Sequence, residues 1–429
     1  MKVLLATIGT RGDVQPFIAL AVGLARRGHA VTVCTSVRYE DAVAHWGLGF
    51  EPLSDDLVSL VETPEGRHTI AGAGGLSGRV RSFSNLLRTS LQIQRDLFRD
   101  GWTAARHTQP DVIVFHPKMS IAIHYAERLS IPAVMAPLFP LFNATSAYPA
   151  PGVPFVRLGQ RSTALYNRAS HHAVRRTVSL ASRWLFGRWR KSAGLPNLPV
   201  FADVLRRADG APVPLLNGWS RHMLPDPPKG ETDRMLTSGF WFLERPQQWQ
   251  PDRRLVEFLE RGDPPVFVGF GSMSGTDPAR TTDIVLNALD RAGARGVLAS
   301  GWGGLQSAQL NEDMFLLDEV PHDWMFERVA AVVHHGGAGT TAAGLRAGRP
   351  TVVCPFFGDQ TFWGWRVQEL GVGPAPVPQR CLNAERLADA IRQAVESGEM
   401  QNRADALGAA LRQEDGIACA ADFVERTQC

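Results

Sequence analysis

Residues Val332-Val-His-His-Gly-Gly-Ala-Gly-Thr-Thr341 form the most specific stretch of this sequence. The pattern predicts a buried β-strand that ends at two histidines, then a turn of small residues, then a helix that begins at the threonine pair. Free N–H groups and the dipole at a helix start favour an anion, and Thr340 and His335 would add donors. We therefore predict a cradle for a diphosphate. The alternative is a turn that only allows close helix–strand packing, with Thr340 as an ordinary N-cap.

Outward from this stretch, short β-branched runs alternate with segments of helical period, which is typical of βα repeats around a parallel sheet. The first series has predicted strands at residues 3–9, 30–36, 111–116 and 132–138 and helices at 16–27, 39–46, 80–107 and 120–129. The second has strands at 266–272, 296–300, 314–318, 331–335 and 351–355 and helices at 278–292, 340–347, 361–370 and 384–397. With 429 residues, the chain is expected to be an α/β protein of two tandem Rossmann-like domains.

Both series open with a hydrophobic strand that runs into a glycine-rich turn, at residues 3–13 and 266–272. Ligands of open α/β sheets bind beyond the carboxyl ends of strands, so two such edges facing each other would form a cleft. A dinucleotide site is disfavoured, because neither turn has the GxGxxG pattern and the second strand ends without an acidic residue. The sequence has no P-loop GxxxxGK[ST] either.

Charge is unevenly distributed along the chain. The formal net charge is only +3, which gives no reason to expect a nucleic-acid partner. Residues 128–202 nevertheless contain no Asp or Glu, and they hold ten basic residues, which are Arg128, Arg157, Arg161, Arg168, Arg175, Arg176, Arg183, Arg188, Arg190 and Lys191. Outside this basic segment, the chain has 35 basic and 42 acidic residues. The near-neutral total therefore combines a basic segment with an acidic remainder.

The cysteines and apolar runs indicate a compartment. Five cysteines are scattered without a CxxC pair, which argues against a disulfide framework and against a zinc site. The apolar run at residues 3–8 is too short for a signal peptide, and the one at 131–142 is interrupted by three prolines and falls short of the ~20 residues of a spanning helix. We expect a cytoplasmic protein whose only open route to a membrane is peripheral contact at the inner face.

A second polar pair follows a later predicted strand. Asp359 and Gln360 lie just beyond residues 351–355, at the start of the next predicted helix. A carboxylate beside an amide suits the vicinal hydroxyls of a sugar, because the first accepts hydrogen bonds and the second both donates and accepts. The alternative role for Asp359 is an ordinary N-cap.

These residues together resemble glycosyltransferases of the GT-B class. The resemblance is strongest to the family-1 enzymes that include fungal-type sterol glucosyltransferases and the antibiotic aglycone glycosyltransferases of actinomycetes. It rests on six motifs in the correct order over nearly the whole chain, at residues 9–16, 269–272, 300–304, 320–324, 334–341 and 355–360. We accordingly expect an acceptor-binding domain at 1–235, a linker at 236–252, a donor-binding domain at 253–410, and a last helix at 411–429 that packs back on the first domain.

The resemblance implies a role for each matching residue. Asp13 matches the catalytic base that would take the acceptor's proton during in-line attack on the anomeric carbon, with inversion; its alternative role is to cap the following helix. The remaining donor-site residues are implied as follows: diphosphate contacts at His335, Gly337, Gly339, Thr340, Ser272, Arg11 and Thr10; sugar contacts at Asp359 and Gln360; nucleobase contacts at Trp302, Val320 and His322. N–H and positive groups would replace the metal of other transferases, so no metal and no cofactor are expected.

The resemblance leaves the donor and the protein's role open in part. Plant members have a glutamate that grips the ribose three residues beyond the position of Thr340, and here that position is Ala343. UDP-glucose is favoured by the sterol-type motifs, and a dTDP-sugar is the alternative. Two further alternatives are a GT-B sugar-nucleotide epimerase and a non-catalytic nucleotide-sugar-binding relative, both disfavoured by the complete set of transferase motifs.

The acceptor side is less family-like. Apolar and aromatic residues are common at 139–189, so a pocket for a lipophilic sterol, terpenoid, polyketide or other natural product is expected, with candidate contacts at His116, Phe139, Phe142 and Asn143. The basic run with Trp184, Phe186 and Trp189 predicts an amphipathic element for an anionic membrane surface. Its alternative is a solvated helical face or a contact with the acidic remainder of the chain. The sequence does not indicate an oligomeric state.

Overall fold

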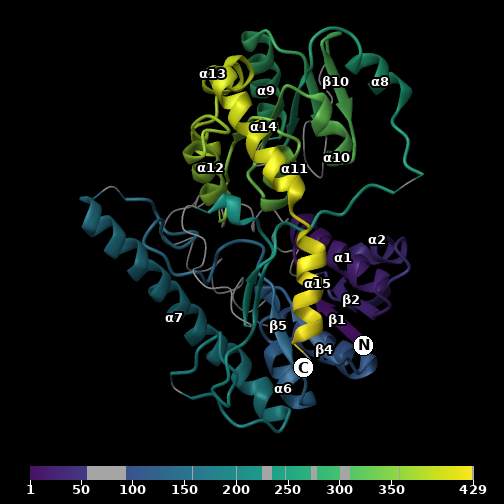
Figure 1. The fold of residues 1–429 in the computed structure, drawn as a ribbon, viewed down its shortest axis with the longest axis vertical. Helices are drawn as coiled ribbons and strands as arrows, with labels where there is room; N and C mark the ends of the chain where they lie inside the picture. Colours follow the sequence, from purple (N-terminus) through teal and green to yellow (C-terminus); the bar gives the residue numbers. More distant parts are fainter. Residues whose placement is uncertain are drawn as a thin grey trace. The chain divides into compact units, whose positions relative to one another are not determined.

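The computed structural model describes residues 1–55, 93–156, 158–199, 201–224, 234–246, 248–271, 278–299, 310–356 and 358–427. The chain divides into two compact units, residues 1–243 with 415–429, and residues 244–414. Each unit is built on one parallel sheet with helices on both faces (Figure 1). The predicted α/β class with two Rossmann-like domains is confirmed.

The sheet of the N-terminal unit has the strand order β3-β2-β1-β4-β5-β6-β7. These strands are β3 (Gly49–Leu53), β2 (Ala30–Ser36), β1 (Lys2–Ala6), β4 (Val112–Phe115), β5 (Ala133–Met135), β6 (Leu215–Asn217) and β7 (Met235–Thr237). All neighbouring strands pair in parallel. The order reverses between β1 and β4, and such a switch point is where open α/β sheets bind their ligands.

Successive residues of β1 point into two different cores. Val3 and Leu5 belong to the core under helices α1 (Arg11–Arg26) and α15 (Gly416–Arg426), whereas Leu4 and Ala6 belong to the core under α6 (Ala122–Leu129) and α7 (Gln160–Ser192). This alternation follows from the two-residue period of a strand. The last helix, α15, packs against α1, and Glu425 accepts a hydrogen bond from His29 at 2.8 Å.

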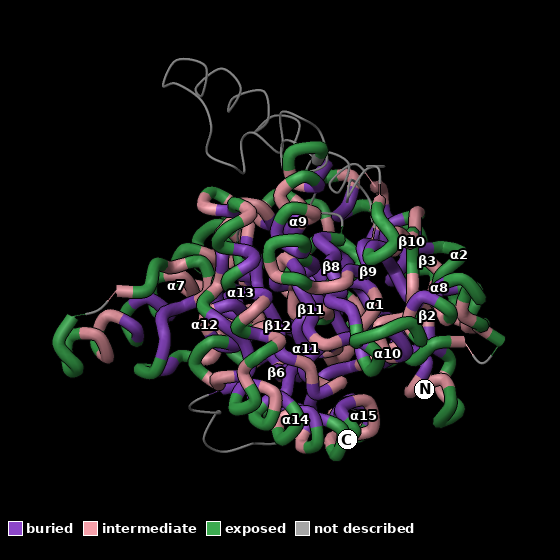
Figure 2. The backbone as a smooth tube through the Cα atoms, turned by 90° about the horizontal axis from the view of Figure 1, so that it is seen from above, coloured by how far each residue is buried: buried purple, intermediate pink, exposed green. Residues whose placement is uncertain are grey.

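The C-terminal unit repeats the same arrangement with five parallel strands in the order β10-β9-β8-β11-β12. They are β10 (Met314–Leu317), β9 (Gly296–Ala299), β8 (Val266–Gly269), β11 (Ala331–His334) and β12 (Thr351–Val353). Its helices are α8 (Arg253–Leu259), α9 (Pro278–Ala292), α10 (His322–Met325), α11 (Ala338–Arg346), α12 (Gln360–Glu369), α13 (Ala384–Glu396) and α14 (Gly398–Gln413). Figure 2 shows β8, β11 and β12 in the buried colour, whereas β10 at the edge of the sheet is mostly intermediate. The switch point lies between β8 and β11.

The remaining described elements are one longer helical stretch and several short ones. Helix α2 spans Glu40–Ala44, residues 93–108 are helical, and five 3-10 turns lie at Val37–Tyr39, Pro117–Met119, Arg221–Met223, Phe326–Arg328 and Gln379–Cys381.

Several predicted boundaries were wrong. Helix α1 begins at Arg11, five residues before the predicted start, because Thr10 and Asp13 form a capping box ahead of Pro16. Helix α11 begins at Ala338 with Gly337 as its N-cap, so Thr340 is the third helical residue and not the N-cap. Strands β3, β6 and β7 and the 33-residue helix α7 were not predicted as such.

Candidate active site

Asp13 lies in the first turn of α1, directly after β1. Its Oδ2 accepts a hydrogen bond from the backbone N–H of Thr10 at 2.9 Å, as in a capping box. The carboxylate folds back over Gly9, where a Cβ atom would lie 2.1 Å from Asp13 Oδ2 and where φ is +139°. The helix-capping role expected as an alternative is therefore present. The capping hydrogen bond uses Oδ2 of Asp13, and Oδ1 takes no part in it.

Two residues that follow β4 lie beside Asp13. Lys118 donates from Nζ to Oδ2 of Asp13 at 2.8 Å, and Nε2 of His116 lies 3.6 Å from Oδ1. His116 is 1% exposed, and its Nδ1 accepts the backbone N–H of Lys118 at 3.2 Å, which puts the proton of the neutral ring on Nε2. This Nε2 is buried without a hydrogen-bond partner among the described residues. The structure thus aims a donor at the oxygen that Lys118 does not contact.

The electrostatics of this cluster favour a charged carboxylate. Burial raises the pKa of Asp13, but Lys118, His116 and the hydrogen bonds outweigh it, so the pKa lies below its usual value. Burial lowers the pKa of His116 to about 4, against the raising effect of Asp13 and together with the lowering effect of Lys118. At neutral pH the cluster therefore contains a carboxylate, a neutral imidazole and an ammonium group.

The other candidate residues of the N-terminal unit follow strand β1 or strand β5 in the chain. Thr10 and Arg11 are exposed at the start of α1. Phe139, Phe142 and Asn143 follow β5 and are partly buried. Both amide atoms of Asn143 are buried without a hydrogen-bond partner among the described residues.

In the C-terminal unit, His335 follows β11 and is held between two glycines. A Cβ atom on Gly337 would lie 2.6 Å from Nε2 of His335, and one on Gly271 would lie 3.4 Å from its Cε1. Gly271 follows β8, so the two strands at the switch point both contribute to this contact. Burial lowers the pKa of His335 to about 4, so the ring is neutral at pH 7.

Helix α11 begins beside this ring. The first N–H groups of an α-helix have no intrahelical acceptor, and here they belong to Ala338, Gly339 and Thr340. Gly339 is exposed, and a Cβ atom there would meet nothing within 4 Å. The helix start therefore presents N–H groups, the His335 ring and an open surface at the position predicted for a diphosphate.

The start of α12 lies against the same loop. Gly336 has φ +93°, and a Cβ there would lie 3.1 Å from the backbone oxygen of Gln360. Asp359 is the N-cap residue of α12, but its side chain makes no capping hydrogen bond. Its carboxylate therefore does not have the ordinary N-cap role that the sequence offered as the alternative. Gln360 is 6% exposed and its Oε1 accepts the backbone N–H of Phe356 at 2.8 Å. The start of α12, with Asp359 and Gln360, therefore lies close to Gly336, the residue after His335.

The predicted nucleobase residues lie on a neighbouring loop. His322 begins α10 and stacks on Phe326 with ring centroids 4.4 Å apart, and Val320 packs against the same apolar cluster. His322 also contributes to the lowered pKa of buried His334, after burial and His335, so the three imidazoles share one neighbourhood. Ser272 and Trp302 lie outside the described residues.

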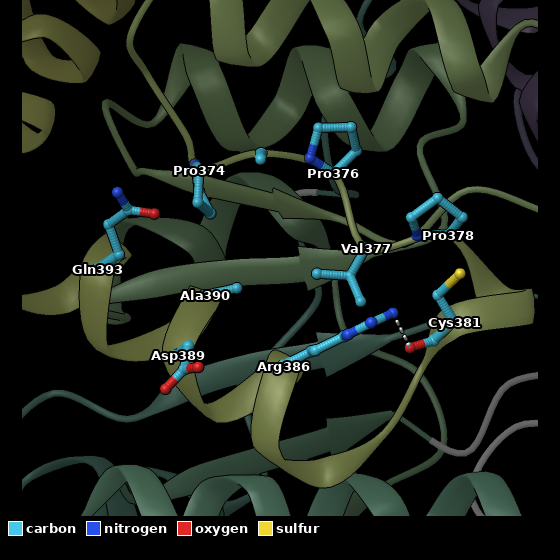
Figure 3. Close-up of a pocket in the computed structure, with 10 residues that line it drawn as sticks. Pro374, Pro376, Val377, Pro378, Cys381, Arg386, Asp389, Ala390 and Gln393 are labelled. Carbon is cyan, nitrogen blue, oxygen red and sulfur yellow. Dashed lines mark hydrogen bonds between the residues drawn. The ribbon is translucent and has the colours of Figure 1, made fainter.

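A surface pocket of the C-terminal unit is separate in its residues from all of these candidates. It has a volume of about 570 Å³ and lies between α13 and the proline-rich segment before Cys381 (Figure 3). Its lining residues are Pro374, Ala375, Pro376, Val377, Pro378, Cys381, Arg386, Asp389, Ala390 and Gln393. Arg386 donates to the Cys381 carbonyl oxygen at 3.3 Å, which ties the two walls together.

Two family models match the chain, one in each half. Residues 3–149 match the glycosyltransferase family 28 N-terminal domain, and residues 302–415 match the erythromycin biosynthesis protein CIII-like C-terminal domain. Among solved structures, the chain resembles the glycotransferase of kitacinnamycin with a TM-score of 0.69 at 20% identity, covering 100% of this chain and 99% of that one. It also resembles the glycosyltransferase VinC in complex with dTDP, with a TM-score of 0.62 at 17% identity over 100% and 99% of the two chains. These likenesses show the GT-B fold.

Curated relatives are closer in sequence. Sterol 3-beta-glucosyltransferase UGT80A2 of Arabidopsis thaliana is 35% identical over 97% of this chain and 64% of its own length. UGT80B1 of the same plant is 34% identical over 99% of this chain and 68% of its own length. The Aspergillus fumigatus sterol 3-beta-glucosyltransferase is 34% identical, but the chain spans only 30% of it. The chain belongs to the GT-B glycosyltransferase family that includes the sterol 3-beta-glucosyltransferases.

Proposed function

We propose that this chain transfers a hexose, glucose from UDP-glucose, to a hydroxyl group of a lipophilic acceptor such as a sterol, terpenoid or polyketide. The observation that carries the proposal is the Asp13 carboxylate at the switch point of the N-terminal sheet, held by Lys118 and faced by His116. An alcohol becomes a competent nucleophile when a positioned base takes its proton as the new bond forms. Asp13 would be that base, and attack from the face opposite the leaving nucleotide would invert the anomeric centre.

The donor half of the proposal rests on the start of α11. Departure of a nucleoside diphosphate develops negative charge, which N–H groups at a helix start and an imidazole N–H stabilise. The N–H groups of Gly339 and Thr340 and the ring of His335 would supply these groups, with Gly337 as the N-cap of the helix. Asp359 and Gln360 would hold the hydroxyl groups of the hexose. Val320 and His322 would contact the nucleobase of the donor. With charge stabilised in this way, the transfer is proposed to need no metal ion.

A dTDP-sugar donor is the second candidate. Ala343 stands where the resemblance to plant family-1 glycosyltransferases would lead one to expect a ribose-gripping glutamate, and it packs with the apolar cluster around Phe267 and Val332. This side chain offers no acceptor to a 2′-hydroxyl group, so it does not favour a ribose over a deoxyribose. A structural relative, VinC, was solved with dTDP.

The proposal is tested by product mass spectrometry. UDP-glucose, UDP-N-acetylglucosamine and dTDP-sugars are each offered with sterol, terpenoid, polyketide, flavonoid and hydroxy-fatty-acid acceptors, with and without EDTA. We expect a hexosylated product from UDP-glucose whose yield EDTA does not change. Donor binding without any glycosylated product across the panel would instead identify a non-catalytic sugar-nucleotide-binding relative.

The proposal also places the chain in the cytoplasm. It is supported by the scattered cysteines of the sequence. Within the described residues, no helix is both long and apolar enough to cross a membrane.

A further inference from the structure

Helix α7 and the segments next to it in the chain carry an unusual set of exposed side chains. Seven large hydrophobic side chains are exposed among the described residues, and six of them lie between residues 155 and 201. These six are Phe155, Leu158, Leu165, Leu180, Trp184 and Phe201. Figure 2 shows α7 largely in the exposed and intermediate colours. Leu180 and Trp184 lie one turn apart on α7, so their exposed side chains are neighbours, and adjoining exposed apolar groups of this kind indicate a contact surface.

Two apolar residues lie between two arginines along one stripe of this helix. Arg176, Leu180, Trp184 and Arg188 recur every four residues and are all exposed, so each neighbouring pair is one turn apart and the stripe winds slowly around the helix by about 40° per step. We call these four residues the outer stripe. Trp184 is 66% exposed, and the Arg176 guanidinium lies 5.0 Å from the ring centroid of Phe201, which is 77% exposed. Phe201 thus extends the stripe sideways.

The inner face of α7 holds two further residues of the basic segment, Arg175 and Arg190, and corrects part of the sequence-based hypothesis. Arg190 is fully buried and donates from Nη2 to Glu127 at 3.0 Å, and Arg175 donates from Nε to Asp203 at 2.9 Å. Phe186 is buried, and Trp189 packs edge-on against Tyr125. These four residues hold α7 on the N-terminal unit. The membrane-contact hypothesis therefore applies to the outward-facing residues alone.

We propose that the outer stripe, with Phe201 and Arg183, docks the protein on the surface of an anionic phospholipid bilayer. Exposed Leu and Trp side chains can enter the boundary between head groups and acyl chains, while neighbouring arginines pair with the lipid phosphates. A nucleic-acid duplex would use the charge but leave the apolar groups in water. A second copy of the chain that docked through the same face would bring like charges together. A bilayer is the partner that satisfies both kinds of side chain.

Vesicle co-sedimentation of the full chain tests this inference. The probes are phosphatidylcholine vesicles and vesicles that also contain phosphatidylglycerol, and the readout needs neither sugar donor nor acceptor. We expect binding to the anionic vesicles only, and its release by high salt. The triple variant Arg176→Ser, Arg183→Ser, Arg188→Ser should bind roughly a hundredfold more weakly, since each basic residue strengthens binding roughly fivefold. The double variant Leu180→Ser, Trp184→Ser should also weaken binding.

Matched controls come from elsewhere on the surface. Arg99, Arg253 and Arg254, whose side chains are 69%, 91% and 82% exposed, lie outside the basic segment, and their triple serine variant removes the same charge. Val37→Ser is the apolar control, since Val37 is the remaining exposed large hydrophobic residue of the seven. Both controls should bind like the wild type. Equal losses in controls and stripe variants, no wild-type binding to anionic vesicles, or displacement of the vesicles by duplex DNA would overturn the inference.

Discussion

The ammonium nitrogen of Lys118 lies 2.8 Å from Oδ2 of Asp13, although the two residues are 105 positions apart. They meet because β1 and β4 are neighbours in the sheet and end at the same edge. Together with Thr10, Lys118 engages one carboxylate oxygen, and the buried His116 faces the other. The resting site therefore holds Asp13 charged and oriented before any acceptor arrives.

Removal of Lys118 should shift the acid limb of the pH profile. Burial raises the pKa of Asp13, and Lys118 provides the largest of the lowering effects. In Lys118→Met the pKa of Asp13 should rise, so the base becomes protonated at a higher pH and the acid limb of kcat/KM moves toward neutrality. Lys118→Arg keeps the charge and should leave that limb near its original pH. Identical acid limbs in the wild type and in Lys118→Met would refute this electrostatic role.

Gly337→Ala should weaken donor binding through the His335 ring. An added Cβ would lie 2.6 Å from Nε2 of His335, so the ring must move away from the start of α11. We expect the Kd for UDP-glucose to rise about tenfold, the equivalent of one lost hydrogen bond, as measured by calorimetry. The control is Gly187→Ala in α7, where an added Cβ meets nothing within 4 Å. If both variants bind the donor like the wild type, the diphosphate does not lie at this ring.

The buried Arg190 should matter for stability and not for transfer. Glu127→Gln leaves this guanidinium without its carboxylate partner, and breaking a buried pair costs about 3–5 kcal/mol of unfolding free energy. Chemical denaturation measures the loss. The exposed Asp96–Arg99 pair is the comparison, and Asp96→Asn should cost less than about 1 kcal/mol. Similar losses in the two variants would show that Arg190 is satisfied by other groups.

The same pair predicts how stability depends on pH. Burial raises the pKa of Glu127, but the neighbouring His124 and the hydrogen bonds that Arg190 donates outweigh it and lower the pKa from 4.5 to about 2. Because the folded-state pKa is depressed, the stabilisation is complete above pH 4.5 and is lost as the pH falls toward 2. Denaturation at several acidic pH values should show a shallower dependence in Glu127→Gln. An unchanged slope would mean that other carboxylates dominate acid unfolding.

The sequence was most informative where a site is continuous in the chain. The stretch from His334 to Thr341 carries its strand, turn and helix start together, so the pattern predicted the elements around His335 to within two residues. Lys118 was missed because its role depends on strand order. The available signal was its position just after β4, the strand that pairs with β1.

Other elements could not be predicted because their patterns are weak. Strands β6 and β7 have three residues each, too few to reveal an alternation. In α7, the inner and outer faces both carry apolar and basic side chains, as Phe186 and Arg190 inside and Trp184 and Arg188 outside show. A helical period is obscured when its two faces have similar composition.

The most direct test of the proposed chemistry is Asp13→Asn, which keeps the size of the side chain and removes the base. Two quantities are measured on the same preparation, the Kd for UDP-glucose by calorimetry and the rate of product formation by mass spectrometry. We predict an unchanged donor Kd and a transfer rate reduced at least a hundredfold, as is typical when a general base is removed. Full transfer activity in Asp13→Asn would contradict the assignment of Asp13 as the base.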